Sequence, residues 1–222
     1  MPGDYSLRSS MGSLTFRATD HTTFRSGLPD RNQRSLPMPA EPLFTVGHSN
    51  RTLPDFVGVL RSAGIQVLVD VRRFPASRRH PHFNAGLLKD ELAAVGIVYR
   101  HFPELGGYRD TPDIPSSSPN DGWPPGFLRN YADYAMTEAF QAALRHLRET
   151  LRPKTVLMCA EKSWADCHRQ IISDYLIALG HEVIHVIDAD RREHGALTTF
   201  ARQAEGGLIT YPAARSQLQL DL

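Results

Sequence analysis

The sequence predicts an α/β protein of three layers, in which a mainly parallel sheet of about five strands lies between helices on both faces. Two observations predict this class. Short apolar segments alternate along the chain with segments whose apolar residues recur at helical spacing. Several helical segments also end at a glycine, namely Gly64, Gly96 and Gly180, as helices commonly do. Such alternation favours a parallel sheet that is buried on both faces.

The regular pattern begins at residue 43. The predicted strands are residues 43–46, 67–71, 97–102, 155–160 and 182–187. A capping-box-like start at Thr52 predicts the first helix. Further helices are expected over residues 84–95, on the apolar face from Phe140 to Leu151, and on the face from Ile172 to Leu179.

Three segments are expected along the chain. Residues 1–40 are rich in Ser, Thr, Arg and Pro without a hydrophobic period, which predicts disorder. Met38, just before the regular pattern, is an alternative start codon. Residues 41–190 form the predicted α/β domain, and residues 191–222 a peripheral C-terminal segment.

Composition excludes several classes of protein. A formal net charge of +1 means that nucleic-acid binding would need a local basic patch. No apolar run approaches the roughly 20 residues of a membrane span, and the N-terminus lacks the apolar middle of a secretory signal. Two cysteines in 222 residues do not indicate a disulfide scaffold. We therefore expect a cytoplasmic protein with reduced thiols and no membrane partner.

Chemically useful side chains follow the predicted strands. Because parallel strands carry sites at their carboxyl ends, we expect one shared edge. The residues that end or follow strands are His48, Asp70, Arg72, His101, Glu104, Cys159 and Glu161.

Residues 155–170 contain both cysteines. Asp166 is the predicted N-cap of a helix whose first turn would hold Cys167, His168 and Arg169. A helix start favours a bound anion and lowers the pKa of a thiol. An anion site, a Cys167 nucleophile and inert packing all stay open. The phosphatase loop C-x5-R is not supported, because Cys159 and Arg169 form C-x9-R.

A metal site is not predicted. Cys159, Cys167, His168 and His48 are ligand types that zinc accepts, but the usual C-x2-4-C spacing is missing. His181–His185 spells H-E-x-x-H, yet it follows a helix-ending glycine and is better explained as a core strand than as a zinc-protease helix. We therefore expect neither a metal nor another cofactor.

Arginines are dense in residues 72–83. Arg72, Arg73, Arg78 and Arg79 lie there, and no acidic residue occurs between Asp70 and Asp90. Guanidinium groups suit phosphate oxygens, and Phe74 and Phe83 could stack on bases or anchor the loop. A solvated charged face is the alternative.

A glycine pair and a tyrosine pair also have predicted structural roles. Gly106 and Gly107 indicate a tight turn or a close approach of the backbone to a ligand. Tyr131 and Tyr134 have helical spacing and favour core packing over substrate stacking.

Several ordered stretches together resemble the domain-of-unknown-function family 488. The resemblance covers roughly residues 43–188 and is carried by "TVGHSNRT", "VDVRRFPASRR", "LGGYR", "YADYAM", "MCAE" and "CHR". It implies an α/β fold but brings no established reaction. The residues that it singles out are His48, Asn50, Arg72, Cys159, Glu161, Cys167, His168 and Arg169.

The last six residues, Gln217–Leu222, are QLQLDL. They resemble the Q-L-x-L-x-L peptides by which bacterial repair and replication proteins dock on the sliding clamp. A tail of this kind lays spaced leucines into an apolar groove, so the expected contacts are Gln217, Leu218, Leu220 and Leu222. Chance, or a final strand at a sheet edge, would give the same letters.

The leading hypothesis is a protein that binds or processes nucleic acid or a nucleotide, in the setting of DNA repair. An enzyme of this kind would have hydrolase-like activity. Its predicted catalytic residues are Cys159, Glu161, Cys167 and His48, and its predicted anion-binding residues are Asn50, Arg72, Arg73, Arg78, Arg79, His168 and Arg169. A cysteine-dependent enzyme for a small phosphorylated metabolite and a non-catalytic anion-binding module are the competing interpretations.

Overall fold

The computed structural model describes residues 41–109 and 118–214. They all fall within the unit Pro39–Leu222. The predicted disordered segment, residues 1–40, and the clamp-like peptide Gln217–Leu222 lie outside the described residues. Those two expectations therefore stay predictions.

The predicted α/β class is confirmed by a six-stranded sheet with the order β3-β2-β4-β1-β5-β6. Five strands are parallel, and β6 is antiparallel to β5. The strands are β1 (Leu43–Gly47), β2 (Val67–Asp70), β3 (Val98–His101), β4 (Thr155–Cys159), β5 (Val183–Val186) and β6 (Arg192–His194).

The strand count of about five was one short. β6 has three residues, Arg-Glu-His, with no buried member, so it lacks the alternation of apolar residues that marks a strand in a sequence. A separate two-stranded sheet pairs β7 (Arg202–Gln203) with β8 (Ile209–Thr210).

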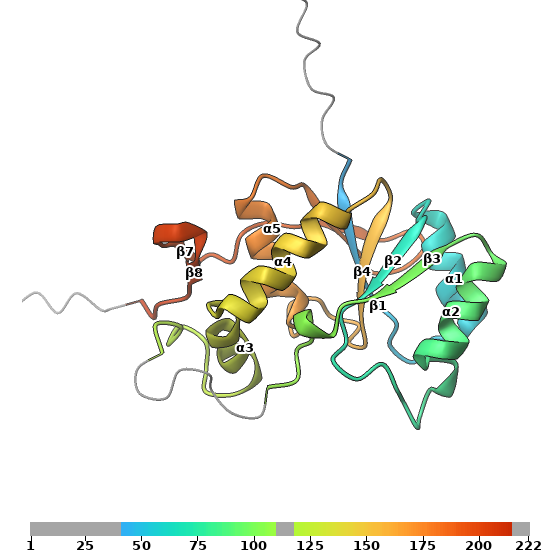
Figure 1. Ribbon diagram of the computed structural model, residues 1–222, viewed down its shortest axis with the longest axis horizontal. Helices are drawn as coiled ribbons and strands as arrows, with labels where there is room; N and C mark the ends of the chain where they lie inside the picture. Colours follow the sequence, from blue (N-terminus) through green and yellow to red (C-terminus); the bar gives the residue numbers. More distant parts are fainter. Residues whose placement is uncertain (1–40, 110–117, 215–222) are drawn as a thin grey trace, which may run out of the picture. The chain divides into compact units, whose positions relative to one another are not determined.

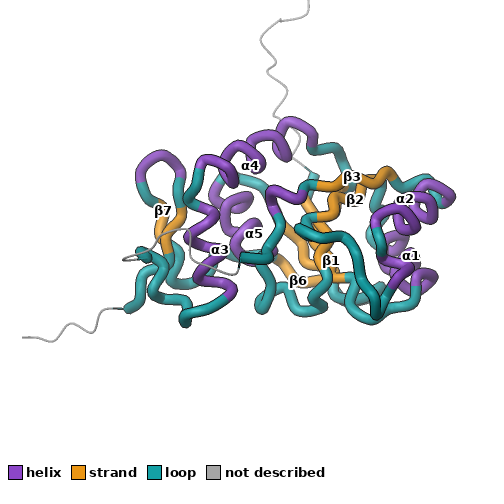
Figure 2. The backbone as a smooth tube through the Cα atoms, turned by 60° about the horizontal axis from the view of Figure 1, so that its bottom comes forward, coloured by secondary structure: helices purple, strands orange, loops and turns teal. Residues whose placement is uncertain are grey.

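Helices cover both faces of the six-stranded sheet. They are α1 (Leu53–Ser62), α2 (Ala85–Ala94), α3 (Phe127–Ala135), α4 (Glu138–Thr150) and α5 (Arg169–Ala178), with short 3₁₀ turns at Pro81–Phe83, Pro103–Leu105 and Glu205–Gly207. Figures 1 and 2 show α1 and α2 on one side of the strands and α3, α4 and α5 on the other. Thr52 caps α1 as predicted, since its hydroxyl accepts a hydrogen bond from the backbone of Asp55.

The two faces of the sheet have separate cores because successive side chains of a strand point to opposite faces. In β4, Val156 and Met158 pack with α1 and α2, while Leu157 and Cys159 pack with α3, α4 and α5. All five residues of β4 are buried. Cys159 therefore ends β4 on the face that α5 covers.

The predicted start of α5 is wrong. Asp166 is exposed, and the helix begins at Arg169 with His168 as its N-cap. The reason is a turn before the helix, in which the Cys167 amide donates to the Trp164 carbonyl at 3.3 Å. Cys167 and His168 thus precede the helix instead of filling its first turn.

The expected strand is confirmed in the last three residues of His181–His185, because Val183–Val186 form β5, and no residue of the segment is helical. The His185 ring lies 2.7 Å from the Thr45 hydroxyl and stacks on Trp164 with centroids 4.1 Å apart. In the part of the chain that the structure describes, no helix has the length and apolar character needed to cross a membrane.

We predict that His185 makes stability depend on pH. Burial, together with the nearby charge of Arg169, lowers the pKa of His185 from 6.5 to about 4. The unfolded chain takes up this proton at higher pH than the folded one, so stability should be complete above about pH 6.5 and should fall as the pH drops toward 4. The loss should reach on the order of 3 kcal/mol. Urea unfolding across this range measures it.

The variant His185→Gln removes this titration and should flatten the pH dependence in part, because His48 titrates in the same range with a pKa of about 4. The matched control is His194→Gln, whose side chain is 78% exposed. If both variants followed the wild-type curve, His185 would not be the responsible group.

Candidate functional site

The candidate site lies at the carboxyl ends of two neighbouring strands whose following helices cover opposite faces of the sheet. β1 and β4 are adjacent, but α1 follows β1 on one face and α5 follows β4 on the other. In parallel sheets such a switch point leaves a crevice beyond the carboxyl ends of the strands. A cavity of about 390 Å³ opens there, lined by His48, Ser49, Arg72, Phe74, Ala76, Ser77, Arg79, His80, Ala160 and Glu161.

Glycine permits the close approach of the two loops at this point. A side chain at Gly47 would place its Cβ 1.7 Å from the Glu161 carbonyl oxygen. The His48 amide donates to the Cys159 carbonyl at 2.9 Å. The loop after β1 therefore lies directly against the loop after β4.

A buried ion pair forms one wall. The Arg72 guanidinium donates from Nε to Asp70 Oδ1 at 2.9 Å and from Nη2 to Asp70 Oδ2 at 2.6 Å. Asp70 Oδ2 also accepts from the Tyr99 hydroxyl at 2.8 Å. Asp70 is fully buried and Arg72 is 7% exposed, so these contacts replace the water that each charge would otherwise bind.

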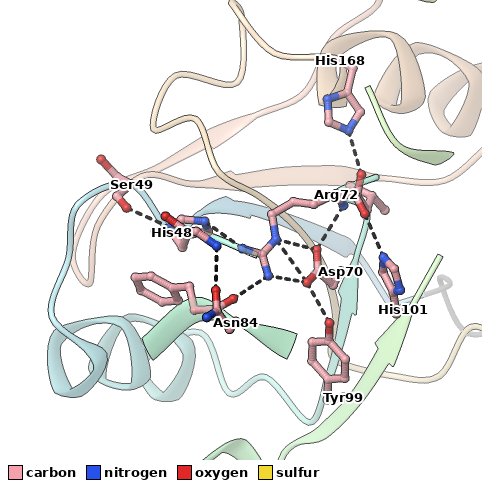
Figure 3. A network of polar contacts seen from close by, with 11 residues as sticks. His48, Ser49, Asp70, Arg72, Asn84, Tyr99, His101 and His168 are labelled. Atoms are coloured by element: carbon pink, nitrogen blue, oxygen red, sulfur yellow. Dashed lines mark hydrogen bonds and ion pairs between the residues drawn. The ribbon is translucent and has the colours of Figure 1, made fainter. Parts of the chain in front are cut away.

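The remaining donors of Arg72 also face protein groups. Nη2 donates to the Phe83 carbonyl at 2.8 Å, and Nη1 lies 3.2 Å from His48 Nε2. Figure 3 shows the guanidinium between His48 and Asp70. The predicted role of Arg72 as an anion ligand would require it to leave these partners, and its geometry favours positioning the wall instead.

His48 also has a protein partner at each of its ring nitrogens. Since Arg72 donates to Nε2, the proton of the neutral ring is on Nδ1, which lies 2.8 Å from the Ser49 carbonyl. Burial, then the charge of Arg72, lowers the pKa of His48 to about 4. The ring is therefore neutral near pH 7, and neither nitrogen is free to take a proton from a ligand unless the Arg72 contact breaks.

Next to the cavity lies a cluster of four side chains, of which Glu161 also lines the cavity. One ligand-type atom from each of Cys159, Glu161, Cys167 and His168 lies within 4.8 Å of all the others. Glu161 Oε2 is 2.7 Å from Cys159 Sγ and 3.3 Å from Cys167 Sγ. His168 Nδ1 is 3.8 Å and 3.6 Å from the same two sulfurs.

A hydrogen bond at the ring nitrogen that faces away from the sulfurs fixes the orientation of His168. Its Nε2 donates to the Val71 carbonyl at 3.0 Å, so in the neutral ring the Nδ1 lone pair faces the sulfurs. Gly107 leaves room for the ring, because a Cβ there would lie 2.2 Å from Nδ1. The close backbone approach predicted for this glycine pair is found, though against a histidine of the chain itself.

Arg169 is buried and bonded within the cluster. Its Nε donates to Cys167 Sγ at 3.3 Å, and its Nη2 donates to the carbonyls of Glu161 and Ser163. The guanidinium thus fixes the loop after β4 and touches one thiol. Like Arg72, it faces protein groups and does not extend toward the cavity as an anion ligand would.

The pKa values of the two thiols are shifted in opposite directions. Burial, followed by the neighbouring Cys167 and Glu161, raises the pKa of Cys159. Burial also opposes ionisation of Cys167, but the Cys159 hydrogen bond, then the contact with His168 and the charge of Arg169, outweigh it and lower the pKa of Cys167. Cys167 is therefore the thiol that ionises first.

The loop between β2 and α2 carries three exposed arginines. Arg73, Arg78 and Arg79 are exposed, and no carboxylate of the described residues forms an ion pair with them. Arg79 lines the cavity, and Arg78 lines an adjoining hollow of about 600 Å³. Arg73 donates to the Tyr108 carbonyl at 2.8 Å.

The structure brings together most of the predicted site residues. Cys159, Glu161, Cys167, His168 and Arg169 form one cluster, and His48, Arg72 and Arg79 line the cavity beside it. Asn50 is exposed and is not part of the cavity lining.

Sequence reasoning missed the anchoring role of Asp70 and the contact from Tyr99. Asp70 stood at a predicted strand end, two residues before Arg72, which was the available signal. Tyr99 carried none, because its contact with Asp70 depends on the pairing of β2 with β3. The set of possible metal ligands considered from the sequence included His48. In the structure the fourth member of the cluster is Glu161 instead of His48.

We predict that Asp70→Asn destabilises the fold by about 3 kcal/mol or more, because it leaves the buried Arg72 charge without its counter-ion. Urea unfolding monitored by circular dichroism measures the change. The matched control is Glu138→Gln in the exposed Arg145–Glu138 pair, which should cost less than about 1 kcal/mol. Equal losses in the two variants would contradict the anchoring role of Asp70.

We also predict opposite effects from two glycine replacements. Gly107→Ala places a methyl group against the His168 ring and should destabilise by about 1–3 kcal/mol. Gly58→Ala, in α1 with nothing within 4 Å of the added Cβ, should stabilise by about 0.5–1 kcal/mol, because alanine is the better helix former. Thermal unfolding compares them, and a neutral Gly107→Ala would show that the His168 ring is not confined.

Comparison with known proteins gives one match. The family model described as Domain of unknown function DUF488 matches residues 52–176, which include Arg72, Cys159, Glu161 and Cys167 to Arg169. No curated protein and no solved structure matches the chain. The match covers more than half of the 222 residues, and the chain belongs to the DUF488 family.

Proposed function

We propose that this protein binds nucleic acid or a nucleotide at the strand-end cavity and acts on it with a hydrolase-like activity. One observation carries the proposal. Arg79 and Glu161 both line this cavity, and Glu161 contacts both thiols. A phosphate-bearing ligand held by the arginine loop would thus lie beside the Glu161 carboxylate, which separates the cavity from the two buried thiols.

The cationic side supports a phosphate ligand. Arg78 and Arg79 are exposed side chains without an ion-pair partner in the described parts of the chain, so binding a phosphate would break no ion pair. Guanidinium groups match phosphate oxygens in pairs. Glu161 is the one acidic residue among those that line the cavity.

An aromatic pair next to the arginines supports a base. Phe74 and Tyr108 are 64% and 56% exposed, and their rings meet edge to face with centroids 6.0 Å apart. Exposed aromatic rings beside cations are what single-stranded nucleic acids stack on. A cavity of about 390 Å³ suits a ligand the size of one nucleotide unit.

Glu161 is the proposed general acid or base. It is exposed on the cavity side while its carboxylate lies 2.7 Å from Cys159 Sγ. His48 is the other acid–base candidate, conditional on release from Arg72. Cys159 and Cys167 are the thiol candidates for a covalent step; both are buried and contact Glu161, the residue through which they lie next to the cavity.

The C-terminal peptide would recruit the protein in this proposal. Gln217, Leu218, Leu220 and Leu222 would occupy the groove of a sliding clamp, placing the cavity near DNA under repair. This contact rests on the sequence of the tail alone.

A second candidate is a cysteine-dependent enzyme for a small phosphorylated metabolite. The contact of both thiols with Glu161, which lines the cavity, supports it as well, because an ionised thiol is a strong nucleophile. The two candidates differ in Phe74 and in salt dependence, since a small metabolite needs no stacking platform and releases few counter-ions.

We predict that a labelled single-stranded oligonucleotide binds with an affinity that falls steeply as salt rises. Each lost phosphate contact should reduce the slope of log affinity against log salt by about 0.7. The double variant Arg78→Ala/Arg79→Ala should therefore have a slope shallower by about 1.4. Phe74→Ala should weaken binding by roughly 5- to 100-fold without changing the slope, because stacking releases no counter-ion. Fluorescence anisotropy over a salt series measures both effects.

Arg61→Ala is the matched control. Arg61 is exposed near the end of α1, just before β2 begins, so it lies at the opposite edge of the sheet from the cavity. It should leave affinity and slope unchanged. Absence of binding at low salt, or a wild-type slope in the double variant, would reject nucleic acid as the ligand and leave the small-metabolite enzyme.

A further inference from the structure

We propose that Cys159, Cys167 and His168, with Glu161 as the fourth ligand, form a binding site for one zinc-class divalent ion. This inference does not rest on the nucleic-acid proposal, because it concerns the four-residue cluster alone. It also reverses the expectation from the sequence that no metal is bound.

The spacing of the donor atoms fits a tetrahedral ion. Zinc bonds of about 2.3 Å to sulfur and about 2.0–2.1 Å to nitrogen place neighbouring ligand atoms about 3.5–3.8 Å apart. His168 Nδ1 lies 3.8 Å from Cys159 Sγ and 3.6 Å from Cys167 Sγ. Glu161 Oε2 lies 3.3 Å from Cys167 Sγ. These three edges need only small adjustments.

The fourth edge is shorter for a chemical reason. Glu161 Oε2 lies 2.7 Å from Cys159 Sγ, as a hydrogen bond from thiol to carboxylate. Metal binding removes that proton, and the bond that holds the two atoms together disappears with it. Glu161 is exposed, so its carboxylate can move to the longer distance.

The histidine is held as metal-binding histidines are. Such rings usually donate their other nitrogen to a carbonyl or carboxylate, which fixes the tautomer and aims the lone pair at the ion. Here Nε2 donates to the Val71 carbonyl at 3.0 Å, while Nδ1 faces the sulfurs. Gly107, which clears space for the ring, completes the support.

The charges also favour a cation. Two thiols and a carboxylate converge within 4.8 Å, and all three are anionic when ionised. The contact from Arg169 Nε reaches Cys167 alone. Grouped anions in a buried site need a counter-charge, which a divalent ion bonded to all three would supply.

The donor set selects the ion. Two thiolates and an imidazole favour zinc over magnesium or calcium, which prefer oxygen ligands. Glu161, the fourth ligand, also faces the cavity, so this one position of the site can exchange its ligand with solvent. Exchangeable fourth positions distinguish catalytic zinc sites from closed structural ones.

The test is a titration of the reduced, metal-free full chain with Co²⁺, followed by Zn²⁺. We expect one equivalent of Co²⁺ to give the visible bands of tetrahedral cobalt and a near-ultraviolet thiolate-to-cobalt band, both abolished by Zn²⁺. Zinc should also protect both cysteines from alkylation and raise the Tm, because the ion binds the folded state.

Variants assign the ligands. Cys159→Ser, Cys167→Ser and His168→Gln should each lower the affinity by 100-fold or more, and Glu161→Gln by about 10- to 100-fold. His194→Gln, an exposed histidine on β6, should bind as wild type. The Tm of each metal-free variant shows whether it is folded, and the alkylation test on the wild-type chain does not depend on any variant.

Three outcomes would overturn the proposal. The first is a cobalt spectrum without a thiolate band, and the second is alkylation that zinc does not slow. The third is a reduced pair that forms a disulfide equally fast with and without zinc, which would identify a redox pair instead. Wild-type affinity in folded Glu161→Gln would overturn the assignment of Glu161 as the fourth ligand.

Discussion

The ion pair between Asp70 and Arg72 is the constraint on which the site depends. A buried charge must keep its partners, because a charge left unpaired in the protein interior costs several kcal/mol. Asp70 binds Tyr99 from β3, and Arg72 reaches Phe83 in the loop and His48 after β1. One pair at the end of β2 thereby fixes three neighbouring segments. Their positions define one wall of the cavity.

The residue between the two charges supports the four-residue cluster. Val71 accepts the Nε2 hydrogen of His168 through its carbonyl, while the side chains on either side of it form the ion pair. The backbone at residues 70–72 is thus held by strong contacts and in turn orients a histidine from the start of α5. This explains why residues so far apart in sequence have one shared geometry, and why a change at Asp70 should be felt at His168.

The sequence was sufficient for the fold class and for the edge where the site lies, because hydrophobic period and strand order are local or nearly local properties. It was insufficient for roles that depend on pairing in space. Arg72 and Arg169 looked like anion ligands, but their donors face Asp70 and backbone carbonyls. The C-x7-C spacing of Cys159 and Cys167 argued against a metal, yet a strand end and a turn bring both sulfurs to one point. β6 escaped notice since a three-residue polar edge strand has no apolar pattern.

Glu161 is the residue that connects the cavity with the four-residue cluster. Among the described residues it alone both lines the cavity and contributes an atom to the cluster. Its carbonyl is fixed by Arg169 and lies against Gly47, whereas its carboxylate is exposed. The backbone is therefore rigid while the side chain can turn between the sulfurs and the cavity. A ligand in the cavity and an ion in the cluster would compete for, or share, this one carboxylate, so the occupancy of each should alter the affinity for the other.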